Sequence, residues 1–346
     1  MNSMKLTLEQ IKEITCGAAR ILPEDGGFRF WRFTEHQEQL YTQLRPVIGK
    51  IKNYHPTSTS SSGIRLAFRT DSQSLTLKAE LRRASPRTFF SFDVHIDGKL
   101  FDTLDNFGEN PYPQGAPKTP YPLGIHEKRF SLAAGEKTVE VYFPWSVCTV
   151  LQEISLDEGA SLTPVKRKKT YIAFGDSITQ GYDILRPSAH YVPRLAKALD
   201  ADYINKGVGG EIFFPALGDS PDPVNPDYIT VAYGTNDMTL TDCTDIEDRC
   251  RSFCQGIRKH YPEAKIFLFT PVWRSTWDAD INFDTFPNVE AKLRRAVAEI
   301  PGVTVIHGFD FLPQDVSYLS DGQTHPTDAG FACYFETLWK KLEELV

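Results

Sequence analysis

Four short polar segments in the second half of the chain hold residues that could together cleave an ester bond. In chain order they are Gly175-Asp176-Ser177, Gly209-Gly210, Asn236-Asp237 and Asp321…His325. A serine hydroxyl becomes a nucleophile when a base takes its proton, and histidine is the side chain poised to do so near neutral pH. A carboxylate can orient that imidazole, while a glycine-loop N–H and an asparagine amide can stabilise an oxyanion. These residue types favour nucleophilic acyl transfer.

Each segment also has a simpler interpretation. The serine could be a helix N-cap, the glycine pair a tight turn, the asparagine another helix cap, and the histidine a lone surface residue. What favours a shared site is that all four segments follow or lie near the ends of predicted strands.

Five short apolar runs without alternation predict the strands of a parallel sheet buried on both faces. The runs are 171–174, 202–205, 228–233, 266–270 and 303–306. Amphipathic patterns predict helices at 188–199, 244–261, 285–299 and 327–345, with a loop over 206–227. Strands that alternate with helices predict a doubly wound α/β domain. Because such sheets bind ligands at the carboxyl ends of their strands, we expect the four segments to meet in one crevice.

The four blocks resemble the signature blocks of the SGNH (GDSL-type) hydrolases and occur in the family's order. They are Gly175-Asp176-Ser177, Gly210, Gly234-Thr235-Asn236-Asp237 and Asp321…His325-Pro326. The resemblance implies a flavodoxin-like three-layer α/β/α sandwich over 166–346. It also implies Ser177 as nucleophile, His325 as general base and Asp321 as its orienter. The implied oxyanion hole consists of the Ser177 N–H, the Gly210 N–H and the Asn236 side chain.

The spacing of acid and base departs from the family pattern. The family commonly has Asp-x-x-His, whereas three residues separate Asp321 from His325. Gly322 makes a bulge easy, so the carboxylate can still reach the imidazole. Asp310 and Asp315 are the alternative orienters, and some family members work without the acid.

The first half of the chain shows period-two alternation in 74–81, 90–96 and 139–143, after a short capped helix at 7–14. Many alternating strands with almost no further helix predict a β-sandwich or jelly roll over about 20–160. We therefore expect one domain over 1–165, similar to the jelly-roll modules of some carbohydrate esterases, and a catalytic domain over 166–346. The Pro/Tyr-rich loop 106–124 could stack its aromatics on a sugar or pack them on the surface.

Composition excludes several function classes. The 346 residues carry a net charge of -7, so no overall field attracts nucleic acid or an anionic membrane. No apolar run is long enough for a membrane span, and we expect no signal peptide. Six dispersed cysteines indicate reduced thiols and a cytoplasmic location. Cys250 and Cys254 lie at helical spacing on an apolar face, so no metal site is predicted.

Two competing enzyme classes fit less well. Thr179 stands where an α/β-hydrolase nucleophile elbow needs its second glycine. A dinucleotide fingerprint would need glycine at position 212, where the chain has Ile212. No cofactor is therefore expected.

The predicted function is that of a serine esterase that removes O-acetyl or other short acyl groups from a carbohydrate. Asp176, Trp145, Trp273 and Arg274 are candidate substrate contacts, although the aromatic and arginine side chains could equally serve packing and a salt bridge. One alternative is an esterase or acyltransferase that uses a non-sugar acceptor. Another is a non-catalytic carbohydrate-binding protein on a degenerate hydrolase scaffold. The pattern does not indicate an oligomeric state.

Overall fold

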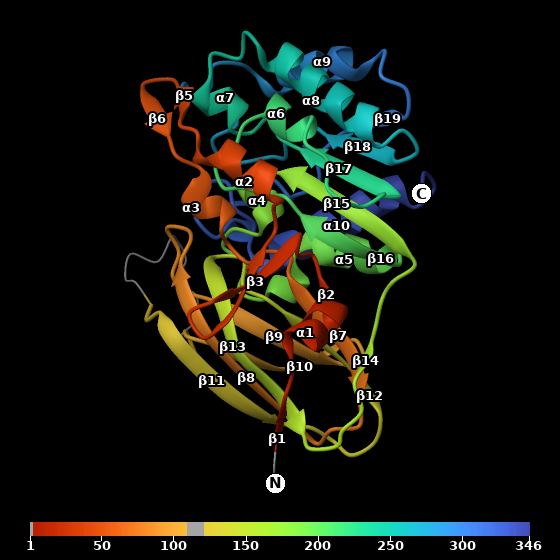
Figure 1. The fold of residues 1–346 in the computed structure, drawn as a ribbon. Helices are drawn as coiled ribbons and strands as arrows, with labels where there is room; N and C mark the ends of the chain where they lie inside the picture. The colour runs from red at the N-terminus through yellow and green to blue at the C-terminus, as the bar shows by residue number, and fades with distance from the viewer. Residues whose placement is uncertain (1–2, 109–120) are drawn as a thin grey trace.

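The computed structural model describes residues 3–108 and 121–346. The N-terminal half contains antiparallel sheets, and the C-terminal half contains a parallel sheet (Figure 1). Two antiparallel sheets of six strands each occupy the N-terminal half. In spatial order, the first contains β11 (Gly124–Ser131), β8 (Ser74–Arg83), β13 (Val147–Asp157), β4 (Gly27–Trp31) and β3 (Arg20–Glu24), with β1 (Ser3–Lys5) paired to β13. The second contains β10 (Lys99–Asp105), β9 (Ser91–Ile96), β12 (Lys137–Tyr142), β7 (Arg65–Thr70) and β14 (Thr163–Pro164), with β2 (Thr15–Cys16) paired to β7.

The alternating side chains form the core between these sheets. Leu75, Leu77, Ala79 and Leu81 of β8 are all at most 1% exposed, as the period of two predicts. Helix α1 (Leu8–Ile14) begins with the predicted capping box, in which Thr7 and the third helical residue exchange hydrogen bonds. The expected all-β sandwich is confirmed for these strands.

The C-terminal half contains a five-stranded parallel sheet in the order β16-β15-β17-β18-β19. Its strands are β15 (Lys169–Gly175), β16 (Ala201–Asn205), β17 (Tyr228–Ala232), β18 (Lys265–Phe269) and β19 (Val303–Ile306). Helices α8 (Ile246–His260) and α9 (Phe286–Val297) pack on one face, and α5 (Tyr191–Ala198) and α10 (Asp328–Leu342) pack on the other. This flavodoxin-like order and its three layers confirm the predicted fold class.

Short helical turns complete the half: α4 (Ser177–Gln180), η1 (Pro187–Ala189), α6 (Pro215–Gly218), α7 (Asp237–Leu240) and η2 (Val316–Tyr318). Cys250 and Cys254 are buried on the inner face of α8, as predicted. Among the residues that the structure describes, no helix is long and apolar enough to cross a bilayer. Most of the loop expected to carry stacking aromatics lies outside the described residues.

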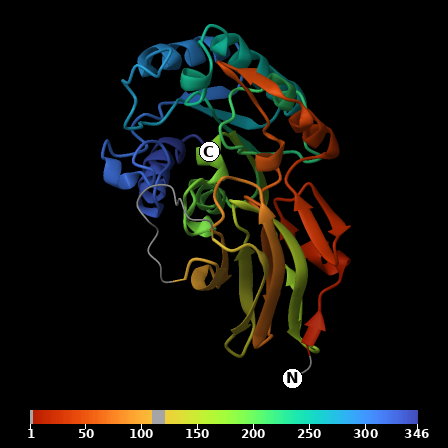
Figure 2. The same cartoon turned by 90° about the vertical axis from the view of Figure 1, so that its left-hand side faces the viewer.

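The expectation of almost no helix between 20 and 160 is wrong. Residues 35–58 form helix α2 (Glu35–Thr42), the hairpin of β5 (Arg45–Val47) and β6 (Lys50–Lys52), and helix α3 (His55–Ser58). A capping box between Thr34 and Gln37 starts α2, which is a signal that the sequence did offer. Phe33, Tyr41 and Tyr54 are buried in the same core cluster as the parallel sheet. This insertion therefore packs against the C-terminal half, beside α6 and α7 (Figures 1 and 2). The boundary at residue 165 stays a prediction.

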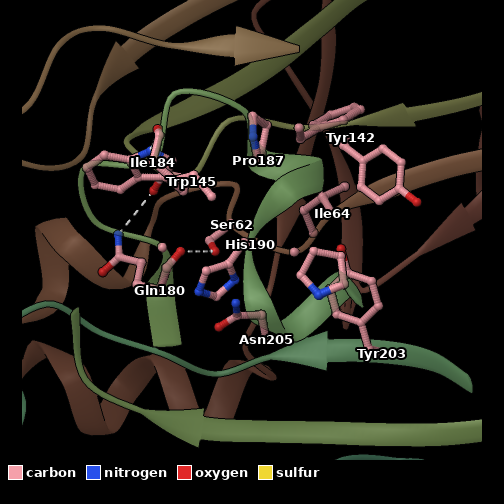
Figure 3. Close-up of a pocket in the computed structure, with 14 residues that line it drawn as sticks. Ser62, Ile64, Tyr142, Trp145, Gln180, Ile184, Pro187, His190, Tyr203 and Asn205 are labelled. Carbon is pink, nitrogen blue, oxygen red and sulfur yellow. Dashed lines mark hydrogen bonds between the residues drawn. The ribbon is translucent and has the colours of Figure 1, made fainter. Parts of the chain in front are cut away.

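Gln180, the last residue of α4, connects the two halves in a tightly packed interface (Figure 3). Its Nε2 donates to Ser60 Oγ (3.0 Å) and to the Trp145 carbonyl (3.1 Å), and its own carbonyl accepts from Ser62 Oγ (2.5 Å). Its Oε1 accepts the Gly209 N–H at 2.7 Å. Buried polar groups that lose such partners are costly, at about 1–3 kcal/mol each. The turn after β15 is thus held by residues of the N-terminal half.

Candidate active site

Ser177 lies where the sequence predicts it, at the first turn after the carboxyl end of β15. Asp176 is the N-cap of α4, and its side chain accepts the Ile178 N–H at 2.9 Å. Burial raises the pKa of Asp176 to about 7. The simple interpretation of this segment as a helix cap therefore applies to Asp176, while the serine side chain remains available for other contacts.

The structure brings Ser177, His325 and Asp321 together in one hydrogen-bonded row. His325 Nε2 lies 2.9 Å from Ser177 Oγ, and His325 Nδ1 lies 2.7 Å from Asp321 Oδ2. An ionised carboxylate only accepts hydrogen bonds, so Nδ1 carries the proton and Nε2 accepts from the serine hydroxyl. This is the arrangement in which the imidazole can take the serine proton.

The loop before α10 accommodates the unusual spacing. Gly322 adopts a left-handed φ of +68°, and nothing lies within 4 Å of the place of a Cβ there. Asp321 Oδ1 accepts the backbone N–H groups of Gln323, Thr324 and His325, so the loop folds around the carboxylate. The two alternative carboxylates have other partners. Asp310 accepts from Lys341 Nζ at 2.5 Å, and Asp315 caps η2.

The groups in this row shift the pKa of the base upward and the pKa of the acid downward. Burial lowers the pKa of His325, but the hydrogen bond to Asp321 and the negative charges of Asp183 and Asp321 outweigh it and raise that pKa above 6.5. Burial raises the pKa of Asp321. The contacts with His325 and with the backbone N–H groups outweigh burial and hold this pKa well below the usual range.

Asp183 is a neighbour of the histidine that sequence reasoning missed. Its Oδ2 lies 3.8 Å from His325 Nδ1, and its side chain is fully buried. Arg87, from the N-terminal half, donates to both of its oxygens (2.6 and 3.1 Å), and Ser320 Oγ donates to Oδ2 at 2.9 Å. Its φ of +66° lies in the left-handed region, which glycine, asparagine and aspartate adopt more readily than other residues. No motif could reveal this residue, because its partner lies 96 positions away.

The aromatic ring of Tyr182 stacks on His325 with centroids 5.1 Å apart. Trp145 also packs on Tyr182, with ring centroids 4.7 Å apart, and donates its indole N–H to the Ile184 carbonyl at 2.8 Å. The histidine ring is therefore fixed by aromatic packing as well as by its carboxylate.

The two expected oxyanion donors lie in loops after β16 and β17. Gly210 has a left-handed φ of +76°, a conformation that favours glycine. Asn236 Nδ2 donates one hydrogen to the Glu211 carbonyl at 3.0 Å, which fixes the amide plane and leaves its second hydrogen for another acceptor. Asn236 is also the N-cap of α7, but its side chain makes no capping hydrogen bond.

The four candidate substrate contacts are all buried, at 3–6% exposure; they are Asp176, Trp145, Trp273 and Arg274. Both tryptophans belong to the core cluster that includes α5 and α10. Arg274 is bound by the Thr235 carbonyl and the Asn282 side chain. Because an aromatic ring must expose a face to stack on a ligand, burial argues against direct contact by the tryptophans.

Asp183, Asp321 and His325 form the one cluster of possible metal ligands among residues 3–108 and 121–346, with their atoms within 4.8 Å. The oxygens of Asp183 already accept from a guanidinium and a hydroxyl, and those of Asp321 accept from N–H groups. The cluster's hydrogen bonding therefore matches a base-orienting network.

A cleft of about 660 Å³ opens beside this cluster, lined by Asp183, Asp321 and Asp328 among others.

Comparisons with known proteins agree with this architecture. Residues 173–333 match the GDSL-like lipase/acylhydrolase family. No curated protein matches the chain. A salicylyl-acyltransferase from a tetracycline biosynthetic pathway is similar in structure, with a TM-score of 0.80 and 22% identity over 99% of this chain and 97% of that one. A putative GDSL-like lipase from Bacteroides ovatus has a TM-score of 0.74 and 18% identity, covering 99% and 98%. A family two carbohydrate esterase from Cellvibrio japonicus has a TM-score of 0.63 and 16% identity, covering 100% and 99%.

At such identities the structural likeness establishes only the fold, for both halves. The family match assigns residues 173–333 of the C-terminal half to a family. Residues 173–333 therefore form a GDSL-like lipase/acylhydrolase domain, and the protein is a hydrolase that acts on ester bonds.

Proposed function

We propose that the protein is a serine esterase that removes O-acetyl or other short acyl groups from a carbohydrate. The observation that carries this proposal is the row of hydrogen bonds from Ser177 Oγ through His325 to Asp321, at 2.9 and 2.7 Å. Ser177 attacks the ester carbonyl while His325 takes its proton. The protonated imidazole then gives that proton to the leaving alcohol, and a water molecule activated by His325 releases the acyl group from Ser177.

The negative charge of each tetrahedral intermediate needs donors that are already oriented. We assign this role to the Ser177 N–H, the Gly210 N–H and the Asn236 amide. The last of these is held in plane by its hydrogen bond to the Glu211 carbonyl. Asp321 keeps the proton of His325 on Nδ1, which leaves Nε2 free to act as the base.

A carbohydrate substrate is supported by the similar structures. They include a family two carbohydrate esterase and an acetyl xylan esterase from Butyrivibrio proteoclasticus. Both match nearly the whole of this chain, with a TM-score of 0.59 for the xylan esterase over 99% of this chain. The localisation that accompanies this proposal is cytoplasmic.

The test is a panel of acetylated mono- and oligosaccharides set against aliphatic esters of several chain lengths. We expect the acetylated sugars to have the highest kcat/KM. Ser177→Ala should lose nearly all activity, by about 10⁶ in kcat as for other serine hydrolases, while remaining folded. A serine-directed phosphonate should label Ser177 alone. A different labelled serine, or an active Ser177→Ala variant, would contradict the mechanism. Absence of turnover by the wild type would favour the non-catalytic carbohydrate-binding alternative.

A second candidate is acyl transfer to an alcohol other than water. It is favoured by the structural likeness to the salicylyl-acyltransferase over almost the whole of both chains. The two candidates differ in the fate of the acyl-enzyme. Adding increasing amounts of a sugar or phenolic alcohol should leave free acid as the main product if the protein is an esterase, whereas a transferase would yield the new ester.

A further inference from the structure

The β5–β6 hairpin belongs to the N-terminal half by sequence but lies over the parallel-sheet half, beside α7 (Figure 1). Three contacts hold it there. Arg45 pairs with Glu211 at 2.6 Å, the Ile48 N–H donates to the Leu240 carbonyl at 2.9 Å, and the Tyr54 hydroxyl that follows the hairpin donates to the Gly210 carbonyl at 2.9 Å. The hairpin is thus attached to the loop that carries the proposed oxyanion donor.

Lys52, the last residue of β6, places its ammonium group against that loop. A Cβ on Gly210 would lie 2.8 Å from Lys52 Nζ. The ammonium therefore occupies the space that any side chain at position 210 would need. Lys52 is half-buried, whereas Lys50, two residues earlier on the same strand, is exposed.

The buried carboxylates of the Gly210 loop and of α7 are bound by arginines rather than by Lys52. Arg45 neutralises the buried carboxylate of Glu211, and Arg249 binds Asp237 at 3.1 Å. Lys52 itself forms no ion pair with any residue in the described part of the chain. Burial and the charge of Lys50 both lower the pKa of Lys52. A half-buried cation with no counter-ion is unfavourable for the protein alone, and a ligand with a negative group would remove that cost.

We propose that Lys52 forms an anion subsite next to the oxyanion hole and that the preferred ester carries a carboxylate close to its scissile carbonyl. The carboxylate can belong to the alcohol, as in an acetylated uronic acid, or to the acyl group, as in a dicarboxylic half-ester. This inference rests on the proposed esterase function and specifies its substrate. Lys52 binds the carboxylate through a charge-assisted hydrogen bond, and the nearby donors bind the carbonyl oxygen.

The experiment compares matched neutral and anionic esters. One pair is O-acetylated glucose and O-acetylated glucuronate, and the other is p-nitrophenyl butyrate and p-nitrophenyl hemisuccinate. Lys52→Met is measured beside Lys50→Met, which removes the same charge from the exposed position. We expect Lys52→Met to lower kcat/KM for the anionic member of one pair by about 10- to 100-fold, and to leave its neutral partner within about twofold. Lys50→Met should leave both members unchanged. The pair that responds shows which side of the ester bears the carboxylate.

Binding to an inactive variant gives a readout that does not depend on turnover. Ser177→Ala should bind glucuronate or succinate more tightly than its uncharged analogue, and adding Lys52→Met should abolish the difference. Equal losses for neutral and anionic esters would show that Lys52 acts on the oxyanion or the loop, and would overturn the inference. So would a wild type that hydrolyses neutral esters with no preference for anionic ones. A wild type that hydrolyses no ester would instead overturn the proposed function.

Discussion

The two halves of the protein contribute different things to one site. The proposed reacting groups, Ser177 and His325, lie in the C-terminal half, near the edge where the parallel strands end. The N-terminal half supplies two cations near them, Arg87 on Asp183 and Lys52 beside Gly210. A short motif therefore carries the proposed chemistry of this protein, whereas contacts between residues distant in sequence set the charge around it. If so, changes in the C-terminal row should affect the rate most, and changes in the surrounding charges should alter pH dependence or selectivity.

The largest effect is expected for Asp321→Asn. Asp321 fixes the proton of His325 on Nδ1, and loss of the correct tautomer in a triad costs about 10⁴ in kcat. Steady-state kinetics on an acetyl ester measures this loss. Asp310→Asn and Asp315→Asn are matched controls and should behave as wild type, since their carboxylates bind Lys341 and cap η2. A crippled control would place the orienter elsewhere, and three active variants would mean that His325 works without a carboxylate.

An intermediate effect is expected for Asn236→Ala. Loss of one oxyanion donor typically lowers kcat by about 10²–10³, and KM should change little because the donor acts on charge that develops in the transition state. The exposed Asn288 provides the control, and Asn288→Ala should keep wild-type kinetics. An effect on KM alone would instead assign Asn236 to substrate positioning.

The smallest effect is expected for Asp183→Asn, and it concerns pH. The negative charge of Asp183 helps to raise the pKa of His325 above 6.5. The neutral imidazole is the active base, so activity falls as the pH drops through that raised pKa. Removing the charge lowers the pKa, and the acid limb of the kcat/KM profile should move to lower pH. The plateau should stay within about tenfold of wild type, because Asp321 still orients the ring.

The control for this variant is Asp93→Asn, another buried carboxylate, which binds Ser188. Arg87 lowers the pKa of His325, and His325 in turn lowers the pKa of Asp176. Both are unchanged in either variant. An unshifted acid limb in Asp183→Asn would confine Asp183 to a structural role, to be seen as a lower melting temperature.

Sequence alone predicted the parallel sheet and the convergence at its edge, because buried strands have a distinct apolar pattern and their ends share one side. It also placed Ser177 and His325 on that edge, and Gly322 correctly suggested a bulge that lets Asp321 approach the ring. These predictions succeed where a short segment determines its own conformation.

The failures have the opposite cause. Apart from the capping box of α2, the segment that contains α2 and the β5–β6 hairpin is short and polar, and contacts with residues more than 150 positions away hold it. A substrate contact by Trp145 or Trp273 stays a prediction, and both side chains are buried. Nothing in the sequence marks Asp183, since its importance depends on Arg87 and on a fold that brings both to His325.

The left-handed backbone of Asp183 limits how the enzyme's pH optimum can evolve. At a φ of +66° only glycine, asparagine and aspartate are readily tolerated. Glutamate would preserve the charge but strain the chain, and most neutral residues would do the same. Natural variation and laboratory selection for acid-tolerant forms should therefore converge on Asn or Gly at this position, both of which remove the charge without disturbing the turn.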